Sequence, residues 1–212
     1  YINLRKRIKK LNNWIFVYTF IGASLFTLAV DFVFENVLEP HQKDRIEVLL
    51  GKKEDFKGVG YNVNQSKIAI GSGGVLGKGF LNGTQTKFNF VPEQDTDFIF
   101  CTIGEEWGFI GSSLTIILFI VLCTKLIKMA ERQRSKFARI YGYSVASIIF
   151  FHFFINIGMT IGLLPVIGIP LPFISYGGSS MMVSMFMVGI LLNISKKRIK
   201  KIRVQSNVRY IQ

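Results

Sequence analysis

One charge-free stretch constrains the fold of this chain more than any other feature. Residues 140–195 are 56 consecutive positions without Asp, Glu, Lys or Arg. Two shorter stretches, residues 14–30 and 107–124, are 17 and 18 positions long and equally free of these charges. A helix of about 17–25 apolar residues crosses the hydrocarbon core of a bilayer, and a soluble domain has no need of such stretches. The chain is therefore predicted to be a polytopic membrane protein.

Composition narrows the class further. Only 18% of the 212 residues are charged, against about 25% in an ordinary soluble domain. The 20 phenylalanines argue against disorder, and two cysteines are too few for a disulfide scaffold. A net charge of +13 would suit nucleic acid, but the cations flank the apolar stretches, so we expect no nucleic-acid partner.

The 56-residue stretch is too long for one crossing and has to contain a break. Three prolines and the pair Gly177–Gly178 fall in its middle, where a helix is hard to continue. The segment 165–178 is therefore predicted to be non-helical and packed against protein, with Phe173, Ile174 and Tyr176 as buried anchors. The predicted fold class is an all-α membrane bundle with transmembrane helices at about residues 13–34, 98–124, 140–164 and 179–194.

Lysine and arginine predict how these helices are oriented. Residues 1–10, 125–139 and 195–212 hold 18 of the 26 cations and a single carboxylate. Four crossings put all three segments on the same side, which the positive-inside rule makes cytoplasmic. Residues 195–212 are then a cytoplasmic basic tail. The loop 35–97, where nine carboxylates offset eight cations, is extracytoplasmic.

The long loop contains a segment rich in glycine and amides, residues 60–90, which is expected to fold back against the helices. Its glycines have neither Walker A nor dinucleotide-binding spacing. Backbone N–H groups and Lys78 are candidates for binding an anion such as a lipid diphosphate. The alternative is that the glycines merely permit tight turns.

Carboxylates at the membrane boundary are a sharper signal. Asp97 is expected in the first turn of the helix that begins near residue 98, with Glu105 and Glu106 about 12 Å further along. Ionisable groups at such depth usually face a protein interior or a water-filled cavity. For the glutamates we expect an internal ion pair that locks helices together. Asp97 is a candidate general base, or alternatively only a helix cap. No residues have zinc-site spacing.

Three strings resemble the SEDS family of bacterial wall synthesis, which includes RodA, FtsW and SpoVE. They are GYNVNQSKIAIGSGGVLGKGFLNGTQTKFNFVPEQDTDFIF, GEEWGFIGS and NIGMTIGLLPVIGIPLPFISYGGSS. Residues 77–79 followed by 83–85 are more similar to RodA than to FtsW. The family fold has ten transmembrane helices, so the resemblance implies that the four helices here are the last four. Residues 1–212 are then a single, partial membrane domain, and a start without Met on a basic segment is expected of a fragment.

The resemblance implies a peptidoglycan glycosyltransferase that polymerises lipid II at the outer face of the bacterial cytoplasmic (inner) membrane, for rod shape and cell elongation. Its implied partners are a class B penicillin-binding protein transpeptidase and the elongation machinery. The family's essential acid lies in the motif Pro-Glu-x-x-Thr-Asp-Phe-Ile-Phe and is Asp97 here, with Asp95 where relatives often have His. The implied substrate-binding residues are Gln42, Arg45, Lys78, Gln85, Glu93 and Thr96.

Arg45 is expected to bind the departing diphosphate bidentately and Lys78 to act on it as a point charge. The resemblance assigns no metal ligand and no definite cofactor, and it leaves open whether Mg²⁺ or Mn²⁺ takes part. Two other functions stay open. A lipid II flippase would require a polar path across the whole bilayer, and a noncatalytic scaffold for a penicillin-binding protein would not require Asp97.

Overall fold

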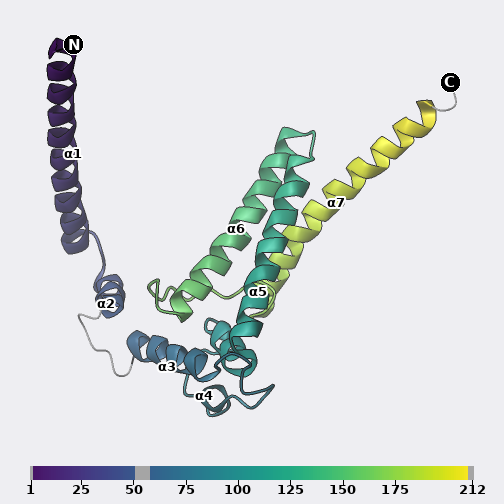
Figure 1. The fold of residues 1–212 in the computed structure, drawn as a ribbon. Helices are drawn as coiled ribbons and strands as arrows, with labels where there is room; N and C mark the ends of the chain where they lie inside the picture. The colour runs from purple at the N-terminus through teal and green to yellow at the C-terminus, as the bar shows by residue number, and fades with distance from the viewer. Residues whose placement is uncertain (1, 51–57, 210–212) are drawn as a thin grey trace. The chain divides into compact units, whose positions relative to one another are not determined.

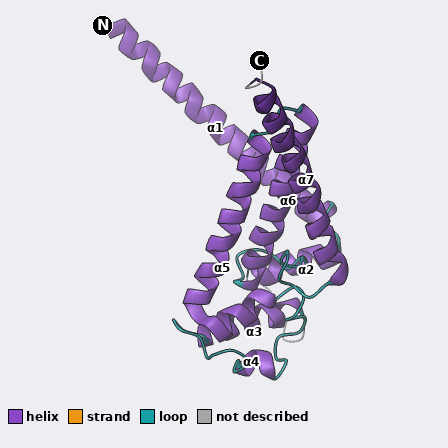
Figure 2. Ribbon diagram, turned by 90° about the vertical axis from the view of Figure 1, so that its right-hand side faces the viewer, coloured by secondary structure: helices purple, strands orange, loops and turns teal. Residues whose placement is uncertain are grey.

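The computed structural model describes residues 2–50 and 58–209 of the chain. These residues form seven α-helices and no β-strand (Figure 2). The predicted all-α fold is thus confirmed for the described part of the chain. Two units, Tyr1–Lys53 and Glu54–Gln212, make up the chain and are described separately.

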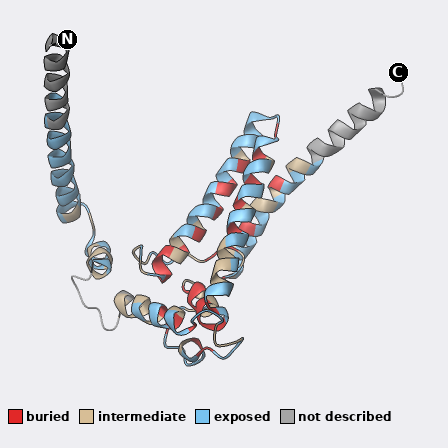
Figure 3. Ribbon diagram, in the orientation of Figure 1, coloured by how far each residue is buried: buried red, intermediate tan, exposed pale blue. Residues whose placement is uncertain are grey.

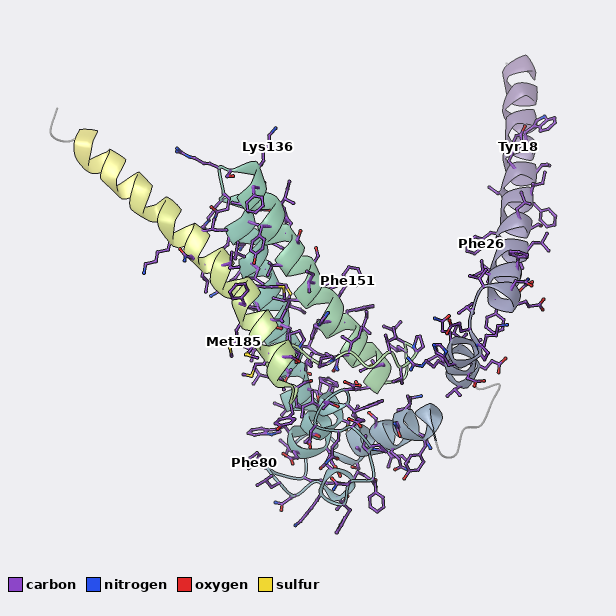
Figure 4. The ribbon with its side chains drawn as sticks, turned by 180° about the vertical axis from the view of Figure 1, so that it is seen from behind. Tyr18, Phe26, Phe80, Lys136, Phe151 and Met185 are labelled. Carbon is purple, nitrogen blue, oxygen red and sulfur yellow. The ribbon has the colours of Figure 1, made fainter. Side chains whose placement is uncertain are left out.

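The first unit contains a long helix, α1 (Ile2–Asn36), and a short one, α2 (Pro40–Leu49). The part of α1 from Val17 to Asn36, 20 residues long, is apolar enough to cross a membrane. Its aromatic side chains point away from the helix axis, as Tyr18 and Phe26 show in Figure 4, and are 66% and 71% exposed. Such a helix is stable only when lipid or other helices cover it.

Local chemistry explains where α2 begins. Pro40 occupies the first helical position, where its missing N–H costs nothing. The side-chain oxygen of Gln42 accepts the backbone N–H of Glu39 at 3.2 Å, as in a capping box. Lys43 Nζ donates to the carbonyl of Glu35 at 2.7 Å, which ties α2 to the end of α1.

The second unit is built on three long helices: α5 (Ile99–Glu131), α6 (Lys136–Thr160) and α7 (Gly178–Arg209). Helices α5 and α6 run antiparallel side by side, and α7 packs on α6 and then diverges from the pair (Figure 1). The buried residues lie on their facing sides (Figure 3). Phe119 of α5 stacks on Phe153 of α6 with ring centroids 4.7 Å apart.

By length and composition, four helical segments could cross a membrane, as predicted: Val17–Asn36, Ile99–Glu131, Lys136–Thr160 and Gly178–Lys196. Their ends differ from the predicted ends. Helix α5 continues past residue 124 to Glu131, and α6 runs from Lys136 to Thr160 instead of from 140 to 164. Helices extend beyond the apolar run because Lys and Arg keep their charges in water while their stems cover apolar surface.

The segment between α6 and α7 is non-helical from residue 161 to residue 177, which confirms the predicted break over residues 165–177, whereas Gly178 already belongs to α7. The prediction of three buried anchors is wrong for two of them. Phe173 packs against the helical core, but Ile174 is 41% and Tyr176 is 80% exposed. The reason is a turn in which the N–H groups of Ile174 and Ser175 both donate to the Leu171 carbonyl, so successive side chains point in different directions.

Candidate functional site

The site is built where two short helices and their loops pack on the start of α5. These are α3 (Val59–Ser72) and α4 (Thr84–Lys87). A small core of α3, the motif loop and α5 residues holds them together, namely Ala69, Val91, Phe98 and Cys101. The predicted folding back of the glycine-rich segment against the helices is confirmed.

Helix α5 is broken at Gly108, where φ is +62° and ψ is −157°, and the α3–α4 loop is inserted into the break. In an unbroken helix the N–H groups of Phe109 and Ile110 would donate to carbonyls four residues earlier. Here they donate to the loop carbonyls of Gly74 and Val75, at 2.9 and 3.2 Å. Glycine is required at position 108, because a Cβ there would collide with the backbone of the loop.

The two helix carbonyls freed by the break are also taken up by the loop. The carbonyls of Glu105 and Glu106 accept the N–H groups of Lys78 and Gly79, each at 3.0 Å. Gly77 lies so close to the Glu106 carbonyl that no side chain fits. All four backbone groups at the break are therefore paired, as an apolar environment demands. The interpretation of the glycines as turn residues alone is incomplete, because they also allow two backbones to touch.

The side chain of Glu105 is fully buried under the same loop. Its carboxylate accepts the Nζ of Lys78 at 2.7 Å, and the backbone N–H groups of Gln85 and Thr86 at 2.9 Å each. The Thr84 hydroxyl donates to the carboxylate at 3.2 Å and accepts from Lys78 at 2.7 Å. A buried carboxylate is tolerated only with such compensation.

This arrangement confirms the predicted internal ion pair for Glu105 in a different form. The cation, Lys78, comes from a loop, so the pair locks the loop to α5 and does not join two helices. Glu106 is buried too, but it makes no ion pair within the described part of the chain. The ammonium of Lys78 is already engaged, and its role toward a diphosphate stays a prediction.

The acidic motif forms a tight turn ahead of α5. The Glu93 carbonyl accepts the N–H groups of Thr96, Asp97 and Phe98 at 3.1–3.2 Å, and the Thr96 hydroxyl donates to the Glu93 carboxylate at 3.0 Å. Because these three N–H groups turn back to one carbonyl, α5 begins only at Ile99, with Phe98 as its N-cap. The prediction that Asp97 lies in the first helical turn is wrong, and so is its interpretation as the helix cap.

Asp97 is instead held between the motif turn and the proline-rich segment. Its Oδ2 atom lies against Gly168, where a Cβ would come within 3.1 Å of it. From α6, the Nδ2 of Asn156 donates to the carbonyls of Asp97 and Ile169, at 2.8 Å each. The motif turn, α6 and the proline-rich segment therefore meet at Asp97, with Asn156 at its main chain and Gly168 at its carboxylate.

This environment raises the pKa of Asp97 above its ordinary value of 3.8. The larger cause is burial, which disfavours the charged form, and the smaller is the neighbouring Glu93 carboxylate. A carboxylate with a raised pKa is a stronger proton acceptor, as a general base requires.

A groove of about 540 Å³ opens beside the motif turn. Its lining includes Asp95, Phe173, Tyr176 and Met181. The N–H of Tyr176 donates to the Asp95 carbonyl at 2.8 Å, which joins the motif turn to the proline-rich segment. The volume suits a small-molecule site, and its lining residues include an exposed tyrosine and an aspartate.

The structure brings some of the predicted site residues together and leaves others elsewhere. Gln42 and Arg45 lie on α2 in the first unit, where Gln42 caps its own helix. Gln85 contributes its backbone N–H to Glu105. One turn gathers Glu93, Thr96 and Asp97, and a second cluster gathers Lys78, Gln85 and Glu105. In the described part of the chain, no three His, Cys, Asp or Glu side chains gather as a metal site.

Sequence reasoning missed two amides that hold these loops. Asn156 ties Asp97 to the proline-rich segment. Gln94 Nε2 donates to the Thr86 carbonyl at 2.9 Å and to Asn89 Oδ1 at 2.8 Å, which braces the loop under α4. A lone amide in an otherwise apolar helix, such as Asn156, is a usable signal, because polar side chains at membrane depth usually face protein.

A family model described as cell cycle protein, covering FtsW, RodA and SpoVE, matches residues 8–200. The chain belongs to this family, the SEDS family. It is 43% identical over 162 residues to the peptidoglycan glycosyltransferase MrdB of Escherichia coli K12. It is 37% identical over 164 residues to the peptidoglycan glycosyltransferase RodA of Treponema pallidum Nichols. Over 161 residues it is 38% identical to the probable peptidoglycan glycosyltransferase FtsW of Enterococcus hirae.

These matches cover 76–77% of this chain but only 44%, 38% and 40% of the three relatives, so the SEDS chain spans less than half of their length. A solved structure, described as showing structural coordination of polymerization and crosslinking by a peptidoglycan synthase complex, contains a similar chain. The TM-score is 0.65 and the identity 26%, over 85% of this chain and 49% of that one. Family and apolar helices together identify a multi-pass protein of the bacterial cytoplasmic (inner) membrane.

Proposed function

We propose that this chain is the C-terminal portion of a ten-helix peptidoglycan glycosyltransferase that polymerises lipid II into glycan strands for cell elongation. The observation that carries the proposal is the Asp97 site. There the family's acidic motif presents a half-buried carboxylate with a raised pKa, fixed against Gly168. Relatives named as peptidoglycan glycosyltransferases support the reaction class.

Asp97 is the general base in this proposal. Lipid II carries a diphosphate leaving group, so no acid is needed to expel a poor leaving group, but the acceptor hydroxyl has to lose its proton. The acceptor oxygen bonds to the sugar carbon that carried the diphosphate, the diphosphate leaves with the bonding electron pair, and the hydroxyl proton passes to Asp97. One carboxylate suffices for this step, whereas glycoside hydrolases use two.

The leaving diphosphate requires cationic partners. The family resemblance implies Arg45 as one of them, and a planar guanidinium can bind two phosphate oxygens at once. Lys78 is better suited to holding the loop. If its ammonium moved to a diphosphate, the fully buried Glu105 carboxylate would lose its counter-charge.

The proposal places residues 35–97 outside the cell and residues 1–10, 125–139 and 195–212 in the cytoplasm. The support is the 18 cations on the three cytoplasmic segments. Asp97 then lies at the outer end of α5, where a lipid-tethered sugar reaches it while the lipid tail stays in the bilayer. The proposed transpeptidase partner is a class B penicillin-binding protein, because the similar solved structure is of a complex that couples polymerization to crosslinking.

Purified whole protein, given lipid II in detergent, tests the proposal. The wild type should form glycan polymer, and Asp97→Asn, nearly identical in shape, should lower the rate at least about 100-fold, as removal of a general base does. Glu131→Gln, a carboxylate change at the other end of α5, is the matched control and should keep the rate.

Three outcomes would overturn the proposed function. Movement of lipid II across vesicle membranes without polymer would favour a flippase. Normal polymer from purified Asp97→Asn would remove Asp97 from the chemistry. No polymer from the purified wild type, together with normal wall growth of cells that carry Asp97→Asn, would favour a noncatalytic scaffold for the penicillin-binding protein.

A further inference from the structure

We infer that Asn156 is a positioning residue for Asp97: its amide fixes the main chain of the proposed base against the proline-rich segment. The inference rests on the proposed function, since the position of Asp97 matters to catalysis only if Asp97 accepts the proton. Asn156 lies on α6, is fully buried and is 59 positions from Asp97 in sequence.

A single nitrogen makes both contacts. Asn156 Nδ2 donates one hydrogen to the Asp97 carbonyl and the other to the Ile169 carbonyl, both at 2.8 Å. A side-chain amide has two hydrogens on a planar nitrogen, and both are used here. Asp and Leu have a similar size but cannot make this pair of bonds, and His places only one N–H at this reach.

The two bonded carbonyls flank the place where the chemistry is proposed to occur. One belongs to Asp97 itself, and the other belongs to the residue after Gly168, against which Asp97 Oδ2 lies. Asn156 therefore fixes the carboxylate and its supporting wall relative to each other. A misplacement of about 1 Å can lower a catalytic rate about 100-fold. Loss of the two Asn156 hydrogen bonds should therefore lower kcat.

Packing alone does not explain an asparagine at this position. Its Oδ1 is buried and has no hydrogen-bond partner among the residues that the structure describes, which costs stability. An apolar side chain would avoid that cost, but it would leave the carbonyls of Asp97 and Ile169 without this donor. The geometry thus favours a residue kept for its two donated bonds.

The test compares Asn156→Asp, Asn156→Leu and Asn156→His with Ser66→Ala in the whole protein. Ser66, on α3, is the matched control, because its hydroxyl donates a buried hydrogen bond of 2.9 Å to a different carbonyl of α6, that of Thr160. Lipid II polymerisation is measured across pH, and hydrogen exchange is followed in the peptides that contain residues 93–101 and 168–176.

We expect Asn156→Asp and Asn156→Leu to lower kcat at least tenfold while KM for lipid II changes less than threefold, with Asn156→His in between. The acid limb of kcat should move to lower pH, because a released Asp97 is better hydrated while Glu93 stays its neighbouring charge. Exchange should rise in both peptides together. Ser66→Ala should keep kcat, the acid limb and both peptides as in the wild type.

The inference is overturned if the Asn156 variants keep kcat within twofold of the wild type while Asp97→Asn is inactive. It is also overturned if none of the three variants accumulates as folded protein, since Asn156 would then be structural. Failure of the proposed function looks different: Asp97→Asn then polymerises normally, or the wild type forms no polymer.

Discussion

Replacing Lys78 with Met should destabilise the second unit far more than a surface lysine change does. The reason is the asymmetry of its ion pair: the Lys78 side chain is 26% exposed, whereas the Glu105 side chain is 0% exposed. Removing the lysine leaves a buried carboxylate without a counter-charge, which costs about 3–5 kcal/mol. We expect the lower end, about 3 kcal/mol, because the N–H groups of Gln85 and Thr86 still donate to the carboxylate.

Replacing the partner, Glu105, should lower the free energy of unfolding by less than replacing Lys78 does. In Glu105→Gln the side chain keeps one oxygen for Gln85, but its amide nitrogen faces the N–H of Thr86, which leaves one buried donor unpaired at about 1–3 kcal/mol. Lys78 can turn toward water. The glutamine carries no charge, so the loss of Lys78 then leaves no unpaired carboxylate. The double variant Lys78→Met/Glu105→Gln should therefore lose less stability than the sum of the two single variants, by about 1–3 kcal/mol, a coupling usual for residues in contact.

The measurement is reversible unfolding of the purified whole protein in mixed micelles, with all four members of the cycle compared. Lys87→Met is the matched control, since Lys87 is an exposed lysine on the neighbouring α4 and should change the free energy of unfolding by less than about 0.5 kcal/mol. If Lys78→Met behaves like Lys87→Met, or if the double change is additive, the ion pair does not hold the loop and our account of Glu105 is wrong.

Three further predictions concern orientation, acidity and the exposed face. Single cysteines at Lys87 and Lys136 in a cysteine-free background should differ, with position 87 labelled by an impermeant thiol reagent in intact cells and position 136 protected; the opposite pattern would invert the topology. The acid limb of kcat should lie above pH 3.8, the ordinary pKa that burial and Glu93 raise for Asp97, and Glu93→Gln should move it to lower pH because a like charge is removed; an unmoved limb would contradict this. Tyr176→Ala should change the free energy of unfolding by less than about 0.5 kcal/mol, because the side chain is 80% exposed, and a larger loss would mean that this ring is covered in the whole protein.

The membrane helices were predictable because their signals are local. A charge-free stretch of 17 residues specifies an apolar helix by its own length, whatever surrounds it. The prolines at 165, 170 and 172 likewise act on their own segment. The end of α6 at Thr160 was less predictable, since the residues that follow are as apolar as the helix itself.

The inserted loop was not predictable in the same way. Gly108 stands in an apolar run and gives no sign that α5 breaks there, and the carbonyls that replace its partners come from residues 74 and 75, more than thirty positions earlier. Taken alone, the loop fits a flexible glycine-rich connection, and α5 fits an ordinary membrane helix. Only their contact explains why Gly77 and Lys78 stand next to each other: one permits the approach, and the other neutralises Glu105.

Most of the buried polar residues lie at the loops around the site, with Gln133 and Ser184 as exceptions, and this distribution connects the two clusters. Ser66, Thr86, Glu105, Asn156, Thr160 and Ser175 are all buried, and each bonds a loop, a helix end or a neighbouring element. The core between α5 and α6 further along is apolar. Polar groups are costly at membrane depth, so their concentration here favours a structural task for them: holding non-helical backbone in a fixed form.

Asp97 lies between the two bonded regions, with the Glu105 cluster fixing the start of α5 and Asn156 fixing the proline-rich segment. A change in either cluster should therefore alter Asp97 without touching its carboxylate. The Lys78 variant acts through α5, and the Asn156 variants act through α6 and the proline-rich segment.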